Sequence, residues 1–241
     1  MPFLQLTGVT KTFGGLTAVD SVDLDIGEHE IVGLIGPNGA GKTTLFNVIA
    51  GVYGPNGGDI LFEGRSLLGL KPYRISKLGL TRTFQLVKPF GGLSALENVM
   101  VGSFHHTKDR VDARKDAEKI LEFMEMGHLR DKKAKALTIS DRKHLEIARA
   151  LATKPKILLL DEPMGGMNPS EVSEMMAQVQ KIREGGITIF IIEHVMKAIM
   201  AISDRVAVLH HGAKIAEGTP QEVASKQEVI TAYLGEEYIE S

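Results

Sequence analysis

The sequence has no cysteine among its 241 residues. Disulfide bonds, thiolate metal sites and cysteine nucleophiles are therefore excluded, and any metal ion must be bound through oxygen or histidine. The formal net charge of -2 is also small. Proteins whose main partner is nucleic acid usually carry a basic stripe or tail, so we expect no nucleic-acid partner.

Long apolar segments are missing as well. The longest apolar runs, such as residues 187–192, are far shorter than the roughly 20 residues that a membrane-spanning helix needs. Residues 1–13 also lack the basic segment and following apolar stretch that mark a secretory signal. We therefore expect a cytoplasmic chain, and a partner protein must provide any link to a membrane.

The composition itself is that of an ordinary globular protein, with 43% hydrophobic and 24% charged residues. A chain of this length can bury the core of one large domain, or of a core with a subdomain. Residues 3–35 alternate apolar and polar side chains, which predicts antiparallel strands with one solvated face. Residues 57–64 predict a further strand bounded by turns.

The later part of the chain divides into a helical block and a strand-helix alternation. Residues of about 88–153 read as helical, with charged amphipathic helices over 110–126 and 140–152. Strands and helices then alternate, and we expect them at the ranges 156–160, 169–183, 187–192, 195–201, 206–209 and 214–216. The pattern predicts an α/β fold with a mixed sheet and an inserted helical block.

The most informative segment fits the pattern G-x-x-x-x-G-K-[ST] and reads Gly36, Pro37, Asn38, Gly39, Ala40, Gly41, Lys42, Thr43 and Thr44. A short apolar run suited to a buried strand precedes it, and helical spacing of Leu45, Val48 and Ile49 follows it. Glycines let backbone N–H groups face phosphate oxygens, and the helix start adds its positive dipole end. Lys42 can reach the outer phosphates and Thr43 can ligate magnesium. The alternative is a purely structural role, as a glycine-rich turn with a helix cap.

A second group of polar residues follows the apolar strand at residues 157–160, where Asp161 and Glu162 stand next to each other. In parallel sheets, ligands bind at the carboxyl edge, so both acids are expected at such a site. Asp161 would hold the hydration shell of a magnesium ion that neutralises the charge of the bound phosphates. Glu162 would orient or deprotonate a water molecule that attacks the outermost phosphate. The alternative is a strand end capped by solvated acids.

These motifs and several others occur in the order typical of ABC transporter ATPases, which the chain resembles over almost its whole length. The further motifs are TFQ at 83–85, LEIARAL at 145–151, DEP at 161–163 and IEH at 192–194. The resemblance implies an α/β P-loop NTPase core with a mixed sheet and an amino-terminal antiparallel β region. It also implies one cassette over residues 1–241, with a helical subdomain inserted at approximately 88–153.

The same resemblance implies the roles of individual residues. Gln85 matches the glutamine that contacts magnesium and the attacking water, and His194 matches the switch histidine that contacts the γ-phosphate. Phe13 lies where an aromatic side chain stacks on adenine. Taken alone, Gln85 reads as a surface amide, His194 as a helix cap or solvated residue, and Phe13 as a core residue. ATP and Mg²⁺ are the implied cofactors.

One motif departs from the family. The signature close to LSGGQ, which binds the γ-phosphate held by the opposite subunit, reads LTISD here, at residues 137–141. Thr138 keeps a hydroxyl, but Ser140 replaces a glycine and Asp141 replaces glutamine. Thr138 and Asp141 also fit a helix capping box, which is the alternative reading. We still expect two ATPase subunits to form a closed dimer. In it, Thr138, Ser140 and the start of this helix would contact the nucleotide that the partner subunit binds.

Within the family, residues 79–85 and 233–237 are similar to the ATPases of branched-chain amino acid importers. The resemblance implies an ATP-hydrolysing subunit on the cytoplasmic face of the inner or plasma membrane. Its partners would be membrane subunits, a second ATPase subunit and, indirectly, a soluble solute-binding protein. The alternatives are a urea-uptake or lipopolysaccharide-export ATPase, a subunit with weak hydrolysis, and a non-transport ABC protein of DNA repair or translation.

Overall fold

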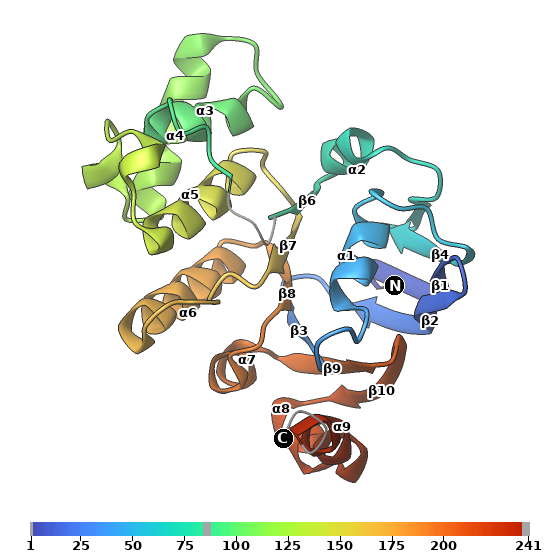
Figure 1. The fold of residues 1–241 in the computed structure, drawn as a ribbon. Coiled ribbons are helices and arrows are strands. Elements are labelled where there is room, and N and C mark those ends of the chain that lie inside the picture. Colours follow the sequence, from blue (N-terminus) through green and yellow to red (C-terminus); the bar gives the residue numbers. More distant parts are fainter. Residues whose placement is uncertain (1, 84–87, 238–241) are drawn as a thin grey trace.

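A six-stranded sheet forms the centre of the computed structural model, which describes residues 2–83 and 88–237 (Figure 1). The strand order is β10-β9-β3-β8-β7-β6, and all neighbours are parallel except β10 and β9. The strands are β3 (Ile31–Ile35), β6 (Leu80–Arg82), β7 (Ile157–Asp161), β8 (Thr188–Ile192), β9 (Arg205–His210) and β10 (Ala213–Gly218). Every residue of β3, β7 and β8 is buried, as expected of parallel strands covered on both faces.

A second, antiparallel sheet is built mostly from the amino-terminal region, in the order β2-β1-β4-β5. Its strands are β1 (Leu4–Phe13), β2 (Leu16–Ile26), β4 (Gly57–Phe62) and β5 (Arg65–Ser66). Alternate residues of β1 and β2 point into the core, so the period-two pattern of the sequence correctly predicted these strands. The α/β class with mixed and antiparallel sheets is thus confirmed.

The two faces of the central sheet belong to different hydrophobic clusters. Residues such as Leu34, Leu159 and Phe190 join the amino-terminal sheet and helix α1 (Lys42–Ile49) in one cluster. Their neighbours along the strands, such as Leu160 and Ile191, face the other cluster, which contains the remaining long helices. This alternation follows from the pleat, which turns successive side chains to opposite faces.

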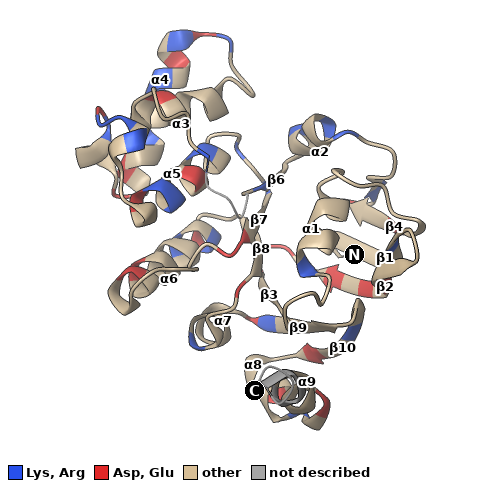
Figure 2. Cartoon of the chain, viewed as in Figure 1, with Lys and Arg blue, Asp and Glu red and all other residues tan. Residues whose placement is uncertain are grey.

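The remaining helices lie mostly on that second side or beyond it. They are α2 (Pro72–Leu78), α3 (Ala95–Ser103), α4 (Arg110–Phe123), α5 (Ile139–Leu151), α6 (Pro169–Glu184), α7 (Met196–Ile202), α8 (Pro220–Ser225) and α9 (Gln227–Glu237), with short 3₁₀ turns at Gly127–Leu129 and Ala134–Ala136. Helix α3 packs on both α4 and α5, and the three lie away from the amino-terminal sheet (Figure 1). Basic and acidic residues are interspersed along α4, α5 and α6 (Figure 2).

Most expected elements are present with shifted ends. Helix α4 ends at Phe123 rather than at 126, because Glu125 adopts a left-handed conformation (φ 60°) that a helix cannot continue through. Helix α2 and strand β6 were not predicted. Among residues 2–83 and 88–237, no helix combines the length and apolar character needed to cross a membrane.

Candidate functional site

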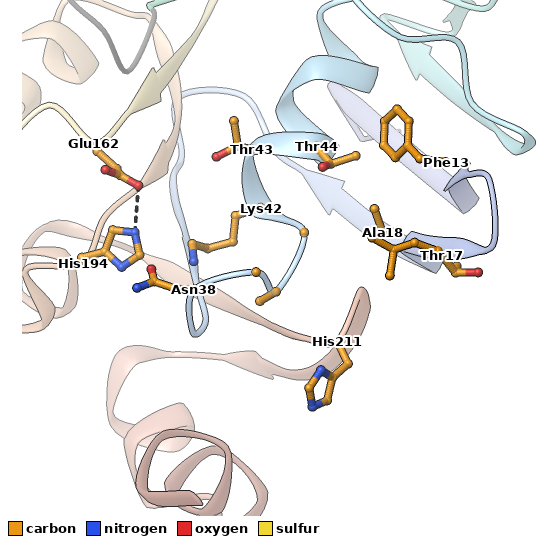
Figure 3. A pocket seen from close by; sticks show the side chains of 14 residues that line it. Phe13, Thr17, Ala18, Asn38, Lys42, Thr43, Thr44, Glu162, His194 and His211 are labelled. Atoms are coloured by element: carbon orange, nitrogen blue, oxygen red, sulfur yellow. Dashed lines mark hydrogen bonds and ion pairs between the residues drawn. The ribbon is translucent and has the colours of Figure 1, made fainter. Parts of the chain in front are cut away.

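Three loops meet at the carboxyl edge of the central sheet. Leu34 of β3 and Asp161 of β7 both pair with Ile192 of β8, so the segments that follow these strands leave the sheet side by side. The first carries the phosphate loop, the second Glu162 and the third His194 (Figure 3). Parallel strand order therefore gathers residues that are more than 100 positions apart in the sequence.

The phosphate loop requires glycine at two positions for steric reasons. A Cβ on Gly36 would lie 2.1 Å from the Leu209 carbonyl oxygen, and one on Gly41 would lie 2.1 Å from that of Ala18. Gly41 (φ 100°) precedes α1 without any side-chain cap. The backbone N–H groups at the start of α1 thus carry no capping side chain and suit an anion.

Lys42 lies in the middle of the cavity (Figure 3). Its Nζ donates hydrogen bonds to the carbonyl oxygens of Gly36 (2.6 Å) and Pro37 (2.8 Å), and the residue is only 6% exposed. Thr43 and Thr44 follow on the first turn of α1 and also line the cavity. These bonds hold the lysine against its own loop and place a cation at the cavity, close to the start of α1.

Asp161 is buried and paired with a residue that sequence reasoning missed. Its Oδ2 lies 2.6 Å from Nη2 of Arg82, whose Nη1 donates to Asn47 Oδ1 at 2.6 Å. Burial raises the pKa of the Asp161 carboxyl, and the Arg82 guanidinium opposes that shift. Oδ1 of Asp161 is buried with no hydrogen-bond partner in the described part of the chain. Asp161 therefore has one oxygen fixed by Arg82 and one buried oxygen that the described residues leave without a hydrogen bond.

Glu162 and His194 form a direct contact across the ends of β7 and β8. Nε2 of His194 lies 2.8 Å from Oε1 of Glu162 (Figure 3). The Glu162 side chain is 19% exposed and that of His194 41%. A partly exposed carboxylate held by an imidazole can accept a proton from a water in the cavity.

Phe13 lies at the opposite end of the same cavity of about 510 Å³. The residue is 42% exposed, and its ring meets that of Tyr53 edge-on, with centroids 5.2 Å apart. The cavity is also lined by four residues that carried no functional signal in the sequence, Leu16, Thr17, Ala18 and His211. An aromatic face and a phosphate loop at two ends of one cavity suit a nucleotide.

The remaining predicted residues lie elsewhere. Thr138 and Ser140 lie at the start of α5 and do not line this cavity. Thr138 Oγ1 accepts from the Asp141 N–H at 3.0 Å, and Asp141 Oδ2 accepts from the Thr138 N–H at 3.2 Å, so the capping box forms. Gln85 lies outside the described residues, and its predicted contact with magnesium and water stays a prediction.

The donors at the site fit a magnesium ion. Magnesium prefers oxygen ligands and keeps several waters and phosphate oxygens, so it needs few protein groups. Thr43 offers a hydroxyl at the start of α1, and Asp161 offers its unpartnered oxygen. An orphaned buried carboxylate oxygen is costly unless a cation or water uses it.

Two protein families match the sequence. Residues 19–165 match the family described as ABC transporter. Residues 213–239 match the family described as branched-chain amino acid ATP-binding cassette transporter. The second match covers β10 and helices α8 and α9.

Whole-length relatives give the same result. The chain is similar to the high-affinity branched-chain amino acid transport ATP-binding protein BraF of Pseudomonas aeruginosa, with 39% identity over 98% of each chain. It is 40% identical to LivG of Escherichia coli K12, which carries the same description, over 98% of each chain.

Solved structures are similar as well. The ADP conformation of an ATP-binding cassette of an ABC transporter matches with a TM-score of 0.89 and 32% identity, over 98% of this chain and 99% of that chain. A dimeric post-hydrolysis state of an ATP-binding cassette, bound to ADP and Pi, matches with a TM-score of 0.81 and 26% identity, over 90% of this chain and 98% of that one.

Proposed function

The chain belongs to the ABC transporter family of ATPases, and on this premise we propose that it hydrolyses ATP to drive the uptake of branched-chain amino acids through partner membrane subunits. The observation that carries the choice of solute is the match of residues 213–239 to the branched-chain amino acid cassette family. The two relatives described above support it, since both are named for that transport over their whole length.

In the proposed reaction, the residues of the phosphate loop, Gly36 to Thr44, hold the phosphates through backbone N–H groups, while Phe13 stacks on the base. Lys42, now bonded to the carbonyls of Gly36 and Pro37, turns its charge to the outer phosphates. Glu162 orients the attacking water and takes its proton as the oxygen bonds to the γ-phosphorus. The bond from that phosphorus to the bridging oxygen breaks, and ADP leaves with its electron pair.

His194 has two tasks in this scheme. Its contact with Glu162 at 2.8 Å holds the carboxylate in place, and its ring can also donate to the γ-phosphate. A bound magnesium ion would supply charge neutralisation on the β- and γ-phosphates. Thr43, Asp161 and Gln85 are the residues that we propose to hold it, Asp161 through Oδ1, which the described residues leave without a partner.

We propose that hydrolysis involves a second ATPase subunit, either a copy of this chain or a related chain, and the dimeric neighbour supports such an arrangement. We propose that residues of about 88–153 act as a helical subdomain, because α3, α4 and α5 pack against one another. Membrane subunits would dock on the cassette and anchor it to the cytoplasmic face of the membrane. A solute-binding protein would act only through them.

A subunit with weak hydrolysis is the second candidate, and the start of α5 favours it. There the Thr138 hydroxyl and the Asp141 N–H bond to each other, so the signature segment is engaged in capping its own helix. Asp141 also adds a negative charge where a partner's phosphate is expected. The intact Lys42, Asp161, Glu162 and His194 in this chain's own cavity oppose that candidate.

The test is transport by the reconstituted complex. The chain is purified with its membrane subunits, placed in vesicles with the solute-binding protein, and supplied with ATP. We expect ATP-dependent accumulation of labelled leucine, isoleucine or valine. Accumulation of urea instead, or association with ribosomes or DNA rather than membrane subunits, would contradict the proposed solute or the transport role.

A further inference from the structure

The backbone of Glu162 is strained. Its φ is 52°, in the left-handed region that residues with a side chain rarely adopt. Such conformations persist only where surrounding contacts determine them, and they gather at functional sites. Here the Glu162 N–H donates to the Ile192 carbonyl at 2.9 Å, and the side chain contacts His194. The carbonyl oxygen is held by a third group.

That third group is Lys143, which the proposed mechanism does not use. Its Nζ donates to the carbonyl oxygens of Glu162 (2.9 Å) and Gly165 (2.6 Å). The lysine is half-buried and belongs to α5, a different element from the turn whose carbonyl oxygens it contacts. One cation thus closes the turn of residues 162–165 from the side of α5.

Glu193 ties the same turn to the loop that carries His194. Only 1% of the residue is exposed. Its Oε1 accepts from the Met164 N–H at 2.5 Å, and its Oε2 accepts from the N–H groups of His194 (3.0 Å) and Val195 (3.3 Å). Burial raises the pKa of Glu193, while these donors and the charge of Lys143 oppose the shift. A buried carboxylate with three backbone donors links two loops.

We infer that Lys143 and Glu193 are positioning residues that hold Glu162 and His194 in the geometry needed for hydrolysis. Glu193 joins the loops after β7 and β8, and Lys143 fixes the strained carbonyl of Glu162 from α5. The pair Glu162–His194 visible in Figure 3 is then the product of contacts from three elements. This inference rests on the proposed function, because it assigns the two residues to the same site.

The experiment compares K143M, K143R and E193Q with the wild-type full-length chain. The matched control is K115M, since Lys115 is an exposed lysine of α4. Hydrogen exchange of amides is measured in each ligand-free protein, and ATP affinity and turnover are measured in the transporter complex. In K143M we expect the Gly165 amide, which donates to the Glu162 carbonyl, to exchange about tenfold faster. In E193Q we expect the same of the His194 and Val195 amides, which donate to Glu193.

In both variants turnover should fall by at least about tenfold, because a small misplacement of a catalytic group costs this much or more. The dissociation constant of ATP should stay within about twofold of the wild-type value, a split that general misfolding would not give. K143R should recover most of the turnover, since a guanidinium can donate to both carbonyls. K115M should match the wild type.

Wild-type exchange rates in K143M and E193Q would overturn the inference. So would faster exchange with unchanged turnover, or a K143R variant as impaired as K143M. Failure of the proposed function looks different, because the wild-type complex itself would then show no ATP turnover. The exchange rates would still decide whether Lys143 and Glu193 hold the two loops.

Discussion

At the scale of single residues, the ion pair between Arg82 and Asp161 is a buried charge contact beside the site. Both side chains are almost fully buried, at 6% and 0% exposure, and the guanidinium also bonds Asn47. Removing one partner of a buried pair leaves the other charge uncompensated, which costs more than the pair itself contributes. Arg82 therefore has a role in stability, which can be measured in the ligand-free chain.

We expect R82M to lower the free energy of unfolding of the ligand-free chain by about 3 kcal/mol. The double variant R82M/D161N should recover part of this loss, because it removes the stranded charge. R114M is the control: the pair of Arg114 with Glu118 lies at the surface, and its loss should cost under about 1 kcal/mol. Urea denaturation measures all three, and equal losses in R82M and R114M would contradict the assignment.

Glu193 should make the folded chain less stable as the pH rises. Burial raises its pKa above the ordinary value of 4.5, so the folded chain holds this proton to a higher pH than the unfolded chain does. Its contribution is fully present below pH 4.5 and is lost as pH rises through the raised pKa. The difference in unfolding free energy between wild type and E193Q should therefore shrink as pH rises from about 4.5.

Glu30 provides the opposite case for the same experiment. Burial would raise its pKa, but bonds from Arg205 and the Gly27 N–H outweigh burial and lower it. Its contribution is present above pH 4.5 and is lost as pH falls through the lowered pKa. The difference between wild type and E30Q should thus grow with rising pH, and parallel pH profiles for E193Q and E30Q would contradict both assignments.

At the scale of secondary-structure elements, helices α3, α5, α6 and α8 each begin with a reciprocal capping box, and those of α5 and α8 both start with threonine. Thr138 and Asp141 cap α5, and Thr219 and Glu222 cap α8 with the same reciprocal bonds. Only the start of α5 is proposed to meet a partner's nucleotide. The two caps therefore separate a structural effect from a functional one.

We expect T138A and T219A each to lower the unfolding free energy by about 1 kcal/mol, the usual contribution of such a cap. ATP turnover of the transporter complex should fall only in T138A. Thermal or urea unfolding and steady-state hydrolysis are the measurements. Unchanged turnover in T138A would show that the Thr138 hydroxyl serves the helix alone.

Restoring the usual residues at the start of α5 gives a second test at this scale. In the double variant S140G/D141Q, the negative charge is removed, while glutamine can still complete the capping box. We expect turnover to rise by less than about threefold, because the helix start already offers N–H groups and a favourable dipole. A change from no turnover to full activity would contradict a working signature and support the weak-hydrolysis candidate.

The elements show what the sequence could and could not predict. The phosphate loop, the two acids at the end of β7 and the helices α4 to α6 carry strong local patterns, and the fold class followed from them. Helix α2 was missed because only Ile75 among its seven residues is buried, so it has no apolar period. Arg82 and Lys143 were missed as site residues because the fold alone brings them to partners on other elements. Glu193 was missed because its bond to the Met164 N–H joins two loops that the sequence does not place side by side.

At the scale of the whole molecule, the nucleotide cavity joins parts of both sheets. Phe13 and residues 16–18 come from the antiparallel sheet, and Glu162 and His194 come from the edge of the central sheet. Binding of ATP should therefore stabilise the two parts together. The acid that completes the reaction in this account is Glu162, and its removal should stop turnover without removing the site.

The most direct measurement is ATP turnover by the purified transporter complex that carries E162Q. Glutamine keeps the shape of the side chain and a contact for His194, but it cannot take the proton of the attacking water. We predict a turnover at least about 100-fold below wild type, ATP binding retained and ATP-bound dimers accumulating. Turnover at the wild-type rate would contradict Glu162 as the general base and, with it, the proposed mechanism.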